Sequence, residues 1–276
     1  MSVQSRFDVT GYGVVVTGGA SGLGLAFGEA LAEGGARVTL IDVDEAGVAR
    51  EAERLRGEGL DVRSAVADVT DHATLDRVID EAAAEYGRLD VAFANAGVDP
   101  GVGFVGAWSG DERPRVEEGK LENYTDERWN RVIDINLTGA FATARAAARH
   151  MRPRGSGRII VTTSMAATCV EPAIGHAYAT TKAGLRHLTR GLALELAAYG
   201  ITVNAIAPGF FVTNIGGGHA HAKEVQEGMS KVIPMHRVGW PEDIKGLALF
   251  LASPAAEYIT GQEVIIDGGW SLGVAD

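Results

Sequence analysis

The sequence predicts a doubly wound α/β fold, with a parallel sheet of about seven strands and helices on both faces. Short runs rich in Val and Ile alternate with longer amphipathic stretches, which is the pattern of strands joined by crossover helices. We expect strands at 14–16, 38–41, 62–67, 91–94, 159–163, 201–207 and 264–266. We expect helices at about 22–34, 44–57, 71–86, 125–151, 176–199 and 241–252, several of them ending in Gly or entered through Asp, Thr or Pro.

The composition is that of one ordinary globular domain over residues 1–276. The chain is 46% hydrophobic and 22% charged, so it can bury a large core, and it shows neither a repeat nor a linker. Two segments, 98–124 and 210–238, fit the strand–helix alternation poorly. We interpret the first as an insertion and the second as a lid, both over a binding site.

Charge and cysteine content exclude several classes of function. The net charge of −11 and a pI near 5.1 give the wrong field for a nucleic-acid backbone or an anionic membrane. A single cysteine, Cys169, leaves no disulfide framework and no zinc-ligand cluster, so we expect no metal. Because no apolar run is long enough to span a bilayer and no signal-peptide pattern opens the chain, we expect a cytoplasmic protein.

A glycine-rich turn follows the first predicted strand directly and leads into a helix. The turn reads Thr17-Gly18-Gly19-Ala20-Ser21-Gly22-Leu23-Gly24. Without Cβ atoms the backbone can approach a pyrophosphate closely, and the free N–H groups of the helix end attract its charge. An ordinary turn is the alternative, but the strand before it and the helix after it favour nucleotide binding.

An acidic residue, Asp42, ends the second predicted strand and is followed by Val43. At this distance beyond a glycine turn, an acid accepts hydrogen bonds from the adenosine ribose and repels a 2′-phosphate. No Lys or Arg stands at Ser21 or Val43 to neutralise such a phosphate, so the sequence favours NAD over NADP. The alternative is that Asp42 only caps the helix near Asp44.

Tyr178 and Lys182 stand four residues apart on one face of a predicted helix. A tyrosine acting as a base at neutral pH needs nearby positive charge, which Lys182 can supply. Such a pair is often only a helix surface. Ser164, however, ends the preceding strand at the sheet edge where ligands bind, and its hydroxyl could hold a substrate oxygen; a turn or cap is its alternative role.

From about residue 13 to 270 the chain resembles the short-chain dehydrogenase/reductase family, because its motifs come in the family's order. Besides the residues above, these motifs are Asp68-Val69, Asn95-Ala96-Gly97, Asn136, Pro208-Gly209 with Thr213, and Asp267-Gly268-Gly269. The resemblance implies a single Rossmann-type domain and hydride transfer between NAD and an alcohol or ketone. The substrate and the direction in the cell stay open, although NAD favours oxidation.

The resemblance also implies a role for each matching residue. Tyr178 is the acid/base, Ser164 orients the substrate oxygen, and Lys182 lowers the tyrosine pKa and grips the nicotinamide ribose. Asn136 holds a water in a proton relay; its alternative is a buried amide satisfied within its own helix. Asp68 and Val69 flank the adenine, although Asp68 could instead cap a helix. The other cofactor-binding residues are Gly18, Ser21, Gly22, Leu23, Gly24, Asp42, Val43, Asn95, Ala96, Gly97, Pro208, Gly209, Phe211 and Thr213.

The sequence departs from the family pattern around the substrate. Thr163 stands where a second Ser is common, the interval from Ser164 to Tyr178 is one residue longer, and segment 98–124 is extended, with Trp108 and a charged run at 111–115. We expect this insertion to wall the pocket or to pack on a neighbouring subunit. Cys169, Glu171 and His176 receive no catalytic role.

In segment 210–238, a Gly-Gly-Gly run at 216–218 precedes His219 and His221. Two histidines without further acidic or cysteine ligands make a poor metal site, so we expect a mobile lid with glycine hinges. Phe210, Phe211 and Ile215 would bring apolar surface over the substrate.

Three function classes remain: an NAD-linked enzyme, a nucleotide-binding regulator without chemistry, and a structural subunit. The complete set of Asn136, Ser164, Tyr178 and Lys182 favours the enzyme. An NADPH-dependent carbonyl reductase is the alternative enzyme, which Asp42 disfavours. The family habit of pairing helices 125–151 and 176–199 across a dyad implies a homotetramer.

Overall fold

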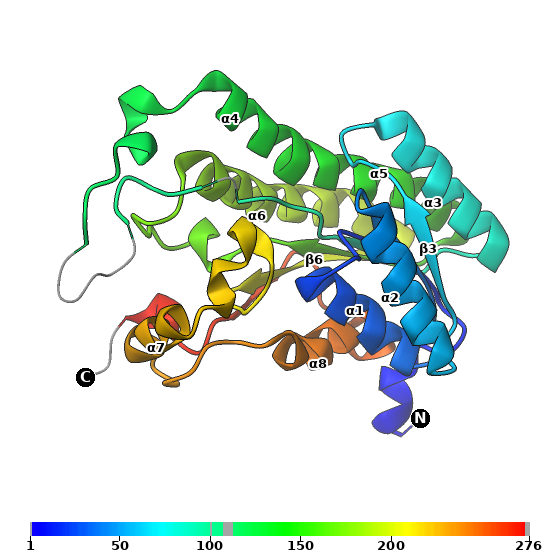
Figure 1. Ribbon diagram of the computed structural model, residues 1–276. Coiled ribbons are helices and arrows are strands. Elements are labelled where there is room, and N and C mark those ends of the chain that lie inside the picture. The colour runs from blue at the N-terminus through cyan, green and yellow to red at the C-terminus, as the bar shows by residue number, and fades with distance from the viewer. Residues whose placement is uncertain (1, 100, 107–112, 274–276) are drawn as a thin grey trace.

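The computed structural model describes residues 2–99, 101–106 and 113–273, and these form one α/β domain with a central parallel sheet (Figure 1). The strands are β1 (Gly13–Thr17), β2 (Arg37–Asp42), β3 (Val62–Val66), β4 (Val91–Ala94), β5 (Gly157–Thr162), β6 (Ile201–Pro208) and β7 (Glu263–Ile266). Their order is β3-β2-β1-β4-β5-β6-β7, and every pairing is parallel. The seven strands predicted from the sequence are confirmed.

Helices cover both faces of the sheet (Figure 1). One face carries α1 (Gly22–Glu33), α2 (Glu45–Gly57) and α8 (Pro241–Ala252), and the other carries α3 (His72–Tyr86), α5 (Gly139–Met151) and α6 (His176–Leu196). Within β1, Val14 and Val16 pack into the first layer and Val15 into the second, so a continuous apolar strand serves two cores. Both faces are therefore buried, as the Val-rich runs predict.

The long helix predicted at 125–151 is wrong in its middle. The structure has α4 (Asp126–Val132), then a π-helix, η4 (Ile133–Thr138), and then α5. A π-helical turn adds a residue to the helix repeat and often marks a functional site. Amphipathic spacing alone cannot distinguish it from an α-helix of the same length.

Segment 210–238 contains a helix, α7 (Lys223–Val232), which the sequence reading missed. None of its residues is buried. It has few apolar residues, an internal Gly228 and no side-chain cap at its first turn, which explains why it reads as loop. Of the described helices, none is long and apolar enough to cross a membrane.

The strand order reverses between β1 and β4, because β2 and β3 lie on one side of β1 and β4 to β7 on the other. In doubly wound sheets the crossover loops diverge at this point and leave a crevice at the carboxyl ends of the strands. The fold therefore opens its crevice beside Thr17 and Ala94, directly before the glycine turn and the Asn95 motif.

Candidate active site

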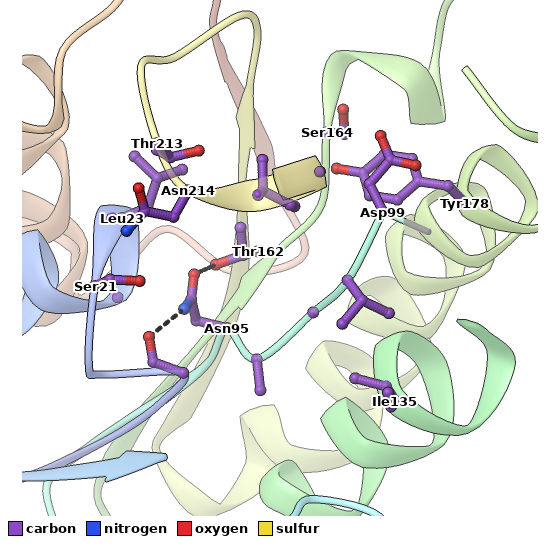
Figure 2. A pocket seen from close by; sticks show the side chains of 18 of the residues that line it. Ser21, Leu23, Asn95, Asp99, Ile135, Thr162, Ser164, Tyr178, Thr213 and Asn214 are labelled. Carbon is purple, nitrogen blue, oxygen red and sulfur yellow. Dashed lines mark hydrogen bonds between the residues drawn. The ribbon is translucent and has the colours of Figure 1, made fainter. Parts of the chain in front are cut away.

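A cavity of about 960 Å³ occupies this carboxyl edge of the sheet. Every residue that the sequence assigned to the site lines it, except Asn136. The predicted lining residues are Gly18, Ser21, Gly22, Leu23, Gly24, Asp42, Val43, Asp68, Val69, Asn95, Ala96, Gly97, Ser164, Tyr178, Lys182, Pro208, Gly209, Phe211 and Thr213. Figure 2 shows Ser21, Leu23 and Thr213 at one end, and Ser164 and Tyr178 at the other.

The glycine turn passes so close to its neighbours that side chains are excluded. A Cβ on Gly24 would lie 2.0 Å from the Gly18 carbonyl oxygen, and one on Gly18, at φ +71°, would lie 2.9 Å from the Ala96 Cα. No described side chain caps the first turn of α1, whose N-cap residue is Ser21. The first N–H groups of α1 are therefore available to an anion such as a pyrophosphate.

The carboxylate of Asp42 is fixed by the backbone on either side. It accepts hydrogen bonds from Ala20 N at 2.9 Å and from Asp44 N at 3.0 Å. The cap of α2 is Asp44, which accepts from Gly47 N. Asp42 is thus held at the cavity rim without capping a helix, and each of its oxygens keeps a lone pair for a ligand hydroxyl.

Asp68 and Val69 lie at the cavity wall beyond β3. Asp68 accepts hydrogen bonds from the N–H of Thr70 at 2.9 Å and from its hydroxyl at 2.8 Å, whereas the N-cap of α3 is Asp71. The residue that caps helix α3 is therefore Asp71 and not Asp68. The geometry leaves Asp68 free to face the cavity.

Asn95 connects the tips of three strands below the cavity floor. Its Nδ2 donates to Thr17 O at 3.0 Å. Its Oδ1 accepts from the Thr162 hydroxyl at 2.9 Å, as Figure 2 shows. Both ends of the amide are occupied by protein groups. Asn95 consequently holds β1, β4 and β5 in register at the cavity, a supporting rather than a contacting role.

Ser164, Tyr178 and Lys182 converge from β5 and α6. The Ser164 hydroxyl lies near the Tyr178 phenol, since it acts on its pKa, and Lys182 Nζ lies 5.4 Å from the centre of the Tyr178 ring. Lys182 is only 3% exposed and donates to Thr162 O at 2.8 Å. Ser164 also accepts from Ala166 N at 3.2 Å, so its cap and its contact with the tyrosine coexist.

Burial dominates the electrostatics of this group. It raises the pKa of Tyr178 above its ordinary value, the Asp99 carboxylate adds to the rise, and the nearby Ser164 hydroxyl opposes it. Burial lowers the pKa of Lys182 to about 8, against the opposite effect of Asp99. The phenol is therefore protonated at neutral pH, the form that donates a proton.

Asn136 lies behind the cavity, in the π-helix. Its Oδ1 accepts from Val98 N and its Nδ2 donates to Val98 O, both at 2.8 Å. The amide is thus satisfied by another segment of the chain rather than within its own helix. A water bound at Asn136 would have to use its main chain or its remaining N–H.

The sequence reading missed several cavity residues. The insertion contributes Val98, Asp99 and Gly101, helix α4 and the π-helix contribute Arg131 and Ile135, and β5 contributes Thr162 and Thr163. Asp99 follows the Asn95-Ala96-Gly97 motif by two residues. This closeness to the motif was the one signal in the sequence that could have marked Asp99 as a cavity residue. Arg131 and Ile135 stand four residues apart on one helix face. This spacing is equally typical of a helix face that only packs against its neighbours.

The insertion packs against the loop that joins Ser164 to Tyr178. Val102 pairs with Ile174, and Arg113 forms an ion pair with Glu171. Trp108, Asp111 and Glu112 lie outside the described residues. The extra residue before Tyr178 therefore falls in a loop that the insertion holds.

The segment after β6 borders the cavity from the opposite side. Ile215, Gly216 and Gly217 line it, and Gly216 to Gly218 all have φ between +65° and +82°. His221 Nε2 lies 3.0 Å from Asn214 Oδ1. Across the described ranges, no group of three or more His, Cys, Asp or Glu side chains could hold a metal.

Comparisons with known proteins agree with this geometry. A family model described as enoyl-(acyl carrier protein) reductase matches residues 18–271. The galactitol 2-dehydrogenase of Rhizobium johnstonii is 38% identical over 98% of this chain and 99% of its own. The NAD-dependent glycerol dehydrogenase of Listeria innocua is 35% identical over 96% of each chain.

A solved structure extends the likeness to three dimensions. The gluconate 5-dehydrogenase from Burkholderia cenocepacia, crystallised with NADP and tartrate, has a TM-score of 0.87 and 33% identity, covering 99% of this chain and 100% of that one. The chain therefore belongs to the short-chain dehydrogenase/reductase family and is a nicotinamide-dependent oxidoreductase.

Proposed function

We propose that the protein is an NAD-dependent dehydrogenase that interconverts a secondary alcohol and a ketone of a small organic substrate. The observation that carries this proposal is the convergence of Ser164, Tyr178 and buried Lys182 in the cavity that the glycine turn borders. Two relatives described above are named for the polyols galactitol and glycerol, which supports an alcohol carbon as the reacting centre.

In this mechanism, a bound nicotinamide supplies the hydride acceptor or donor. Ser164 orients the substrate oxygen, and Tyr178 takes its proton in oxidation or donates one in reduction. Lys182 provides positive charge beside the phenol and a donor for the nicotinamide ribose. Asn136 holds the chain at Val98 and completes the set as the anchor of a proton relay.

The cofactor would lie along the predicted lining residues, with its pyrophosphate at the first turn of α1 and its amide end near Thr213. NAD rather than NADP is supported by Asp42, whose charge is held at the rim by two backbone N–H groups. A 2′-phosphate at that position would meet like charge. An NADPH-dependent reductase is the competing proposal, because some structural neighbours carry NADP or are named for NADPH.

The test combines cofactor titration with one substitution. Purified protein is titrated with NADH and NADPH by fluorescence, and secondary alcohols and ketones are assayed with wild type and Tyr178→Phe. We expect tighter binding of NADH, turnover in wild type, and a loss of about 10²–10⁴-fold in kcat for the variant with unchanged NADH affinity. Tighter binding of NADPH would refute the role of Asp42, and NADH binding without turnover would favour a regulator.

We further propose a cytoplasmic homotetramer. Phe141 on α5 is half-exposed and lines a hollow between α5 and α6 with Ala148 and Leu192, an arrangement that supports a helix-to-helix interface with a second copy. Light scattering coupled to gel filtration measures the mass, and a monomer would contradict this assembly.

A further inference from the structure

Asp99 is a carboxylate in the substrate end of the cavity for which the proposed mechanism has no use. It lines the same cavity as Ser164 and Tyr178 and lies beside them in Figure 2. We propose that Asp99 accepts a hydrogen bond from a second hydroxyl of the substrate, so that the enzyme selects vicinal diols and polyols. The inference rests on the proposed alcohol dehydrogenase function and narrows its substrate class.

The backbone around Asp99 is anchored on both sides. The preceding residue, Val98, is paired through its N–H and its C=O with the Asn136 side chain at 2.8 Å each. The Gly101 N–H also stabilises the charged Asp99 carboxylate. A binding group is effective when its own position is fixed before the ligand arrives, and Asp99 meets that condition.

One oxygen of the carboxylate has no partner. Asp99 Oδ1 is buried and makes no hydrogen bond within the described part of the chain. A buried carboxylate oxygen that stays unpaired carries a desolvation cost, which a donor from the substrate would offset. A substrate hydroxyl is such a donor, whereas a ketone or an alkyl group is not.

The cations around Asp99 do not bond to its unpartnered Oδ1. Arg128, Lys182 and His219 all act on the Asp99 charge. Arg128, however, donates to Glu118 O and Val102 O at 2.9 Å each, and Lys182 donates to Thr162 O. His219 faces Gly216 O at 3.2 Å. Asp99 therefore keeps an acceptor oxygen that none of these cations occupies.

The position of this charge relative to the reacting oxygen defines the substrate class. Asp99 acts electrostatically on Tyr178, so the two groups share one region of the cavity. A hydroxyl on the carbon next to the reacting alcohol would reach Asp99 while the reacting oxygen faces Ser164 and Tyr178. A carboxylate on that carbon, as in a 2-hydroxy acid, offers no donor to Asp99.

The experiment compares matched substrates and matched variants. Wild type, Asp99→Asn and Asp99→Leu are assayed with NAD on 2,3-butanediol against 2-butanol, and on lactate. Wild type should prefer the diol, and Asp99→Leu should lower the ratio of the kcat/KM for the diol to the kcat/KM for 2-butanol by about 10- to 100-fold, mainly through the KM for the diol. Asp99→Asn should keep part of the preference, because its amide oxygen still accepts.

Two further readouts separate binding from a merely structural role. Loss of the Asp99 charge removes one cause of the raised pKa of Tyr178, so the pH profile of oxidation should move to lower pH in Asp99→Asn. Glu171→Gln is the control: it also turns a carboxylate into an amide, on the neighbouring loop, where Glu171 pairs with Arg113 and does not line the cavity. It should leave the diol preference and the profile unchanged.

Failure of the two proposals can be told apart. If wild type turns over no alcohol, the proposed function fails. The thermal shift that 2,3-butanediol and galactitol give the NADH complex then tests Asp99 directly, and it should be present in wild type and absent in Asp99→Leu. Equal loss of diol and 2-butanol activity in Asp99→Leu, preference for lactate, or equal polyol shifts in both proteins would overturn the inference.

Discussion

Replacing Gly24 by alanine should separate cofactor binding from folding. The new Cβ would lie 2.0 Å from the Gly18 carbonyl oxygen and 2.5 Å from Asn95 Nδ2. Ordinary contact distances require these groups to retreat by more than about 1 Å, and one of them is backbone in the turn itself. Displacement of that turn misdirects the N–H groups that would bind the pyrophosphate.

The magnitude follows from the bonds at risk. If two or three hydrogen bonds of about 1 kcal/mol each are lost, NADH affinity should fall by about 2–3 kcal/mol, or roughly 30- to 150-fold. NADH fluorescence titration measures the affinity, and a thermal melt reports whether the variant is folded.

Gly28→Ala provides the matched control on the same helix. Its Cβ would lie 2.4 Å from Leu40 Cδ2, a side-chain methyl in the core, and not from the turn. This variant should melt at a lower temperature yet bind NADH within about threefold of wild type, because overpacking acts on stability. Wild-type NADH affinity in a folded Gly24→Ala protein, or equal weakening in both variants, would refute the reasoning.

Two other predictions concern stability. Burial lowers the pKa of Lys182 from 10.5 to about 8, so between these values the unfolded chain binds more protons than the folded one. The free energy of unfolding should therefore rise with pH, by about 1 kcal/mol per unit above pH 8, and Lys182→Met should lack this rise in urea titrations; parallel slopes would contradict the shift. At the opposite edge of the sheet, Asp90 accepts from Gly13 N at 2.9 Å and pairs with Arg88 and Arg154. Asp90→Ala should cost about 2–3 kcal/mol in urea unfolding without altering NADH affinity, since it leaves a buried N–H unpaired, and an unchanged midpoint would contradict that account.

The sequence alone predicts the parts of the site that depend on residues close together along the chain. The glycine turn, Asp42 and Ser164 each follow a strand, and Tyr178 and Lys182 share one helix face; strand ends and helix periodicity are readable in a short window. Topology then places the carboxyl ends of parallel strands at one edge, so the fold prediction alone brought these residues to one cavity.

Only the tertiary structure decided the features that depend on contacts distant in sequence. Asn136 and Val98 are 38 residues apart, and their pairing, together with the π-helix that contains Asn136, leaves no trace in hydrophobic periodicity. The same pairing anchors the chain before Asp99, whose place beside Tyr178 depends on how the insertion folds back. Local propensity and spacing fix the elements, whereas the polar groups that meet between elements are determined by packing, and packing is a property of the whole chain.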